Sequence, residues 1–181
     1  MSTTGPDPVS TADPATADGV RQLALAWYRR SRTAQIAHAR SAARARALFL
    51  WLGVPAVLLA GFAGSALAAD AFADRRMVIA LASLLAALLT ALQTFLRLDD
   101  KRLAHETASR RFGAIRRELG EVGAVGVADL PAALTRLAEI RADYDDVSSG
   151  SPQVPQRVWE VQKELDRTYA PDEFAAWPPG A

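Results

Sequence analysis

The chain contains no cysteine among its 181 residues, which excludes disulfide bonds, thiolate metal sites and cysteine nucleophiles. Aromatic residues are also scarce, at 7%, whereas half of the residues are hydrophobic, chiefly alanine and leucine. Because these two residue types are strong helix formers, the composition predicts an all-α protein. The segment 19–69 holds seven arginines and no acidic residue, so the net charge of +1 conceals an uneven distribution of charge.

Motifs that carry catalysis are missing as well. The sequence has no glycine-rich phosphate loop, no Gly-x-Ser-x-Gly nucleophile elbow and no histidines at metal-ligand spacing. Neighbouring carboxylates occur at 99–100 and 143–146, but neighbours on a helix point in different directions, which favours solvated faces over acid–base pairs. We therefore expect no enzymatic activity, no metal ion and no cofactor.

Two long uncharged segments dominate the middle of the chain. The first, Ala47 to Ala69, would be about 35 Å long as a helix, enough to cross a hydrocarbon core of about 30 Å. The second, Met77 to Leu96, is of similar length and follows after seven residues. A chain this short has too little other material to bury two such helices, and the first begins too late for a signal peptide. The sequence therefore predicts a transmembrane helical hairpin with these two spans.

Charge on either side of the spans predicts their orientation. Seven basic residues lie between Arg21 and Arg46 and seven more between Arg97 and Arg117, whereas the loop 70–76 holds two arginines and two aspartates. Cytoplasmic flanks of membrane helices are enriched in Lys and Arg. We expect a multi-pass protein of the cell inner (cytoplasmic) membrane with both termini cytoplasmic, whose flanking arginines contact lipid phosphates rather than nucleic acid.

The sequence on both sides of the hairpin predicts helices that continue it. Each carries a stripe of apolar and small residues at helical spacing, and pairing the two stripes would form an antiparallel cytoplasmic stalk. The first stripe comprises Val20, Leu23, Trp27, Ser31, Ala34, His38, Ala42 and Ala45. The second comprises Ala104, Ala108, Phe112, Ile115, Leu119 and Val122.

Two further helices and two tails complete the predicted organisation. Asp129 followed by Pro131 is a suitable cap and first turn for a helix through Tyr144, with Leu130, Leu134 and Leu137 inward. The last helix runs from about Gln156 to Tyr169, with Val158, Val161 and Leu165 on one face. The predicted parts are a disordered N-terminal tail (1–18), a two-transmembrane domain (19–169) and an irregular C-terminal tail (170–181).

One face of the second span is small and weakly polar, opposite a surface rich in leucine. Two interpretations are open: the face lines an aqueous path in an oligomer, or it packs against the first span, whose small residues permit close approach. The face comprises Ser83, Ala86, Ala87, Thr90, Gln93, Thr94 and Arg97.

The two histidines lie at matching distances from the spans. His38 precedes the first span by nine residues and His105 follows the second by nine, so an antiparallel stalk would place both about 13 Å from the membrane. They are interpreted either as half-buried packing residues or as a proton-sensing or metal-binding pair.

This layout resembles the SLATT domain, a bacterial two-helix membrane module associated with nucleotide-second-messenger conflict systems. The resemblance covers about Gly19 to Tyr169. Besides the hairpin, it is carried by Trp27, Tyr28, Ala34 and His38 before it and by Ala104, His105, Ala108, Phe112, Gly113, Arg116, Arg117, Glu118 and Leu119 after it.

The resemblance implies a membrane effector of a bacterial defence system, of the abortive-infection type. Such an effector would oligomerise and form a pore or perturb the inner membrane when a sensor or nucleotide-signalling partner activates it in trans. No catalytic residues are implied. The alternative is a non-conducting membrane adaptor that docks a cytoplasmic partner protein through the aromatic residues Trp159, Phe174 and Trp177.

Overall fold

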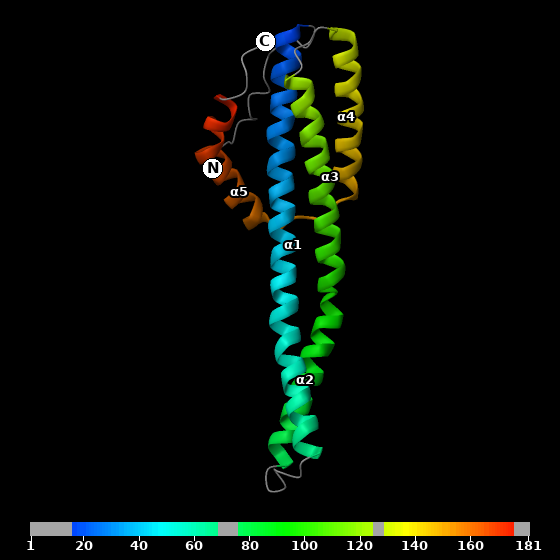
Figure 1. Ribbon diagram of the computed structural model, residues 1–181, viewed down its shortest axis with the longest axis vertical. Coiled ribbons are helices and arrows are strands. Elements are labelled where there is room, and N and C mark those ends of the chain that lie inside the picture. The colour runs from blue at the N-terminus through cyan, green and yellow to red at the C-terminus, as the bar shows by residue number, and fades with distance from the viewer. Residues whose placement is uncertain (1–15, 69–75, 125–128, 176–181) are drawn as a thin grey trace, which may run out of the picture. The chain divides into compact units, whose positions relative to one another are not determined.

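A computed structural model describes residues 16–68, 76–124 and 129–175, and within these ranges every regular element is an α-helix (Figure 1). The chain divides into two compact units, which we describe separately: a terminal unit, Met1–Ala39 with Glu106–Ala181, and a central unit, Arg40–His105. The helices are α1 (Ala17–Ala68), α2 (Arg76–Leu96), α3 (Leu98–Ala124), α4 (Leu130–Gly150) and α5 (Gln156–Ala175). The predicted all-helical fold class is therefore confirmed for the described residues.

Helix α1 begins at the end of the tail expected at 1–18. Thr16 caps it, because the backbone N–H of Gly19 donates to Thr16 Oγ1 at 3.0 Å. Residues 1–15 lie outside the described part of the chain. The stripe predicted along α1 is buried apart from half-buried Trp27 and exposed Leu23.

The terminal unit has a conventional core of large apolar side chains. Phe112 and Leu119 of α3 pack with Val20 of α1 and Ile140 of α4, all nearly inaccessible to solvent. Asp129 caps α4 as predicted, since its Oδ1 accepts the N–H of Ala132 at 3.1 Å. Burial of this apolar surface is the main stabilising contribution to the unit.

Two buried faces differ from the sequence expectation. Helix α4 packs Leu130 and Leu137 inward as predicted, together with Ala133, Ile140, Tyr144 and Val147, but it leaves Leu134, the third residue of the predicted face, exposed. Helix α5 buries Gln162 at 2% exposure and leaves Val161 at 52%, because its inward spacing runs from Val158 through Gln162 to Leu165.

Both C-terminal helices are also longer than expected. Helix α4 continues past Tyr144 to Gly150, and α5 continues past Tyr169 to Ala175. The residues 170–175, expected in an irregular tail, are therefore helical, and 176–181 lie outside the described residues.

The central unit inverts the usual arrangement of side chains. Ala63 of α1 packs against Ile79 and Ala82 of α2, whereas large apolar side chains face outward, with Trp51 78% and Phe95 83% exposed. In the most apolar 18-residue stretch of each of these two helices, only 11% and 17% of the residues are buried, whereas the core helix of a soluble protein is mostly buried. The chain thus has two helices long and apolar enough to cross a membrane.

Candidate functional site

The small, weakly polar face of α2 lies beside an open groove of about 980 Å³ in the central unit. Thr90 and Thr94 line the groove, and Phe95 is the one bulky side chain among lining residues that are otherwise small. The residues that define the groove in the following paragraphs are Ala60 and Gly64 of α1 and Ser83, Ala87, Thr90 and Thr94 of α2.

The hydroxyl groups of the groove are hydrogen-bonded within their own helix. Thr90 Oγ1 donates to the carbonyl oxygen of Ala86 at 2.9 Å, and Thr94 Oγ1 donates to that of Thr90 at 3.0 Å. This bonding uses the hydroxyl proton but leaves oxygen lone pairs able to accept. The groove can therefore lie in an apolar surrounding and still offer hydrogen-bond acceptors.

One member of the predicted face, Gln93, contacts α1 instead, because its Nε2 donates to the carbonyl oxygen of Phe49 at 3.2 Å. The amide can approach because residue 53 is glycine: a Cβ at Gly53 would lie 3.0 Å from Gln93 Nε2. Ala86 is buried but still lines the groove. The structure thus separates a packing part of the face, Gln93, from the residues that line the groove.

Arg97, the last residue of the predicted face, lies between α2 and α3 with a backbone φ of +47°. Left-handed backbone costs a non-glycine residue about 1–2 kcal/mol. The Arg97 side chain pairs with Asp100, with Nε 2.9 Å from Oδ2. The sequence carries no glycine or proline at this break, and the acidic first turn of α3 is its only local sign.

The two histidines belong to different units and are described one by one. In the terminal unit, buried His38 stacks on Phe112, with ring centroids 5.5 Å apart and planes at 27°. In the central unit, burial lowers the pKa of His105 below its usual value. No group of three His, Asp or Glu residues suited to a metal ion occurs in the described ranges. A functional pair of histidines stays a prediction.

The aromatic residues that carry the family resemblance lie in the core of the terminal unit. Trp27 meets Tyr144 edge to face, with centroids 5.2 Å apart, and Tyr144 meets Phe112 in the same way at 5.5 Å. The Arg116 guanidinium lies 5.8 Å from the centre of the Tyr28 ring. These positions therefore have packing roles in the core itself.

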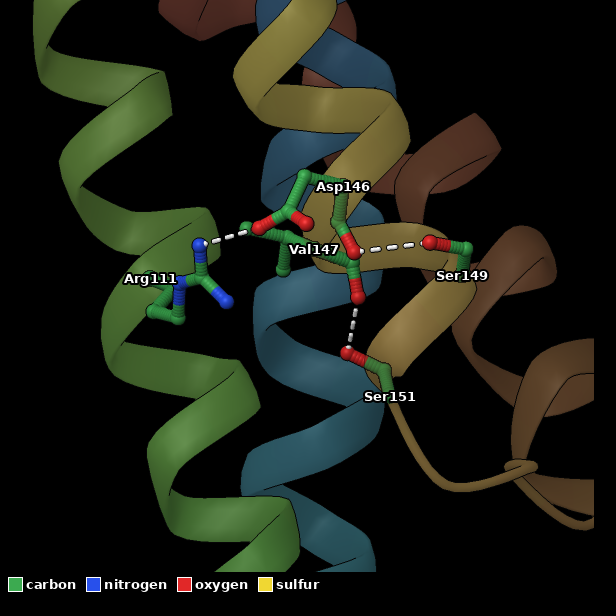
Figure 2. Close-up of polar contacts among 5 residues, drawn as sticks. All are labelled: Arg111, Asp146, Val147, Ser149 and Ser151. Atoms are coloured by element: carbon green, nitrogen blue, oxygen red, sulfur yellow. Dashed lines mark hydrogen bonds and ion pairs between the residues drawn. The ribbon is translucent and has the colours of Figure 1, made fainter.

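Ion pairs join α3 to α4 at the surface of the same unit. Glu118 accepts from Arg136 at 3.0 Å, while Arg117, the other family-like charge, is exposed. Figure 2 shows a second pair, Arg111 with Asp146, at 2.7 Å. Such exposed pairs contribute about 0–1 kcal/mol each.

A polar cleft of about 480 Å³ lies between α1, α4 and α5 in the terminal unit. Its lining includes the cations Arg30 and Lys163, the carboxylate Glu160 and the rings of Tyr144 and Trp159. Burial raises the pKa of Tyr144, and the charge of Arg30 partly opposes this shift. The sequence predicted Trp159 as a docking residue. The other lining residues come from three helices that are far apart in the sequence, so no local pattern could have indicated the cleft.

Comparison with protein-family models, curated proteins and solved structures finds no match to this chain. The SLATT resemblance, the absence of enzymatic activity and the expected partners therefore stay predictions from the sequence. The established description is of a helical protein with two segments capable of crossing a membrane.

Proposed function

We propose that the chain crosses the inner membrane as a two-helix hairpin with cytoplasmic termini and acts as an oligomerising effector that opens a pore or perturbs the bilayer. A sensor or nucleotide-signalling partner would activate it in trans. The inverted central unit supports the membrane location, because outward side chains such as Trp51 and Phe95 need an apolar surrounding. The observation that carries the effector proposal is the hydroxyl-lined groove along α2.

The groove favours contact with a further copy of the chain. Two helices cannot enclose a water-filled path, so conduction requires several copies around an axis. Ala60 and Gly64 on one side of the groove and Ser83 on the other would allow the helix of a neighbour to approach closely. Thr90 and Thr94 would then offer acceptor oxygens along the interior.

The decisive experiment expresses the chain with its native neighbour genes, induces it, and records membrane potential and propidium uptake. We expect the wild type to depolarise the cell, Thr90→Leu with Thr94→Leu to lose at least about ten-fold in uptake, and Thr90→Ser to retain it, since serine keeps the hydroxyl. Gln93→Leu tests the packing part of the face and should weaken the hairpin rather than change the path.

Intact membranes in the activated wild type would refute the effector proposal. That outcome would favour the second candidate, a non-conducting adaptor, which the polar cleft of the terminal unit supports. Its two cations, carboxylate and half-buried Trp159 provide the mixed polar and aromatic surface that protein partners use. Co-purification of one defined protein, lost in Trp159→Ala, would identify that activity.

A further inference from the structure

Arginines lie just before the apolar part of α1 and just after α2, and these two groups differ in whether carboxylates pair with them. On α1, Arg40 is half-buried and Arg44 and Arg46 are exposed, and no carboxylate pairs with them among the residues that the structure describes. At the start of α3, Arg97 pairs with Asp100 and Arg102 with Asp99, each at 2.9 Å. Lys101 is the one cation at the start of α3 that no carboxylate pairs with among the described residues, against three such arginines on α1.

Arg40 and Arg44 continue into an apolar surface on the same side of α1. Arg44 follows Arg40 by four residues, and Trp51 follows Arg44 by seven, so all three lie within about 40° of one another around the helix. Leu48 lies along the helix between Arg44 and Trp51, and both Leu48 and Trp51 are largely exposed. Arg46, by contrast, lies about 200° from Arg44, on the other side of the helix.

This face has the layout of a single phospholipid molecule. Arg44 lies about 5 Å before the first residue of the uncharged stretch, which is the depth of the head-group layer beside the hydrocarbon core. Guanidinium groups bind phosphate oxygens with two hydrogen bonds, and acyl chains pack against leucine and tryptophan side chains. An aspartate near this phosphate would repel it, and the segment 19–69 contains none.

We propose that Arg40 and Arg44 bind the phosphate of an anionic phospholipid, such as a phosphatidylglycerol, whose acyl chains lie against Leu48 and Trp51. The inference rests on the proposed membrane crossing of α1. The flank formed by α2 and α3 binds such a lipid more weakly, because Asp99 and Asp100 pair with Arg102 and Arg97 and would repel a phosphate. The hairpin would therefore prefer anionic over uncharged phospholipid at the α1 flank.

Trp51 itself reports on occupancy of the site. The full chain is reconstituted in vesicles of phosphatidylcholine and phosphatidylglycerol, one of which carries brominated acyl chains that quench nearby tryptophan. Quenching of Trp51, identified by its loss in Trp51→Phe, gives the relative binding constant of the two lipids. We expect phosphatidylglycerol to be preferred about 25-fold, since each of the two arginines near an anionic surface contributes about five-fold.

Charge-matched variants separate a site from a general surface potential. Arg44→Gln should lower the preference about five-fold, and adding Arg40→Gln should remove it. Arg46→Gln removes the same charge from the other side of α1 and should change it less than about two-fold, as should Arg102→Gln combined with Asp99→Asn. Arg44→Lys should retain most of the preference.

Two results would overturn the site: equal quenching by both lipids in the wild type, or equal effects of Arg44→Gln and Arg46→Gln. Release of the wild-type chain from vesicles by alkaline carbonate is a different failure, because it would refute the proposed membrane crossing as well. Retention in the membrane with no lipid preference would refute the lipid site alone.

Discussion

Both units of the molecule place a glutamine against a glycine of the neighbouring helix, but they use the pair differently. In the terminal unit, a Cβ at Gly113 would lie 3.0 Å from Gln35 Nε2, and in the central unit a Cβ at Gly53 would lie 3.0 Å from Gln93 Nε2. Gln93 donates from this position to a backbone carbonyl. Gln35 leaves Oε1 without a partner among the described residues, and Ser109 Oγ donates to its backbone oxygen at 3.0 Å.

The surroundings of the two pairs are opposite. The terminal unit buries Phe112 at 2% exposure, whereas the central unit presents Phe95 at 83% and packs alanines inside. Close helix approach through small residues therefore supplements a large apolar core in one unit and replaces it in the other. This is the difference expected between helices that associate in water and helices that associate in lipid, where burying apolar surface yields little.

The largest difference between the two units is expected when a phenylalanine of each is replaced by alanine. Phe112→Ala should lower the free energy of unfolding of the terminal unit by about 3–5 kcal/mol, because it leaves a cavity in the core. Phe95→Ala, the matched change in the central unit, should change stability by no more than about 0.5 kcal/mol. Chemical unfolding in mild detergent, followed by circular dichroism and limited proteolysis, measures both; similar losses would contradict the inverted arrangement.

Replacing the two glycines by alanine should give a smaller difference in stability between the units. Gly113→Ala should destabilise by about 1–2 kcal/mol, because Gln35 Nε2 and Cδ, at 3.0 and 3.2 Å, must move within a packed interface. Gly53→Ala should be near neutral, since the gain in helix propensity of about 0.5–1 kcal/mol offsets the loss of the Gln93 hydrogen bond.

Gly61→Ala is the control for both glycine variants, because nothing lies within 4 Å of the added Cβ. It should stabilise the chain slightly through helix propensity alone. Thermal unfolding midpoints in the same detergent rank the three variants, and a Gly113→Ala chain as stable as Gly61→Ala would show that the contact with Gln35 is not restrictive.

The smallest expected effect is a pH dependence in the central unit. Burial places the folded-state pKa of His105 below 6.5, so the unfolded chain binds the proton more readily. Stability is therefore complete above pH 6.5 and declines as pH falls from 6.5 toward the folded pKa. Unfolding midpoints between pH 8 and about 5 should show this slope in the wild type and a flatter one in His105→Gln; an unchanged slope would assign it elsewhere.

Local patterns in the sequence predict much of this fold. The uncharged runs ending at Ala69 and Leu96 correspond to helices that end at Ala68 and Leu96, because a bilayer-length apolar run has few alternatives. The cap at Asp129 is likewise local, requiring only a side chain and an amide three residues away. The stripe along α1 follows from helical periodicity alone.

Features that depend on a distant partner were not predictable in this way. Nothing near Gln93 indicates that Gly53 faces it, and nothing near Arg30 indicates Lys163 across the cleft. The outward position of Leu134 on α4 was not predictable either, because it is as apolar as Leu130 and Leu137, and only the opposing helices decide which of the three are buried. The groove beside Thr90 likewise needs two helices to exist.

The left-handed residue between α2 and α3 makes them two separate helices within the central unit. Helix α2 ends at Leu96 and α3 begins at Leu98, and Arg97 between them has a backbone φ of +47°. Such a conformation persists in a residue other than glycine only where the surrounding structure holds it. The break in the helix is therefore set by tertiary structure, with no glycine or proline in the local sequence to produce it.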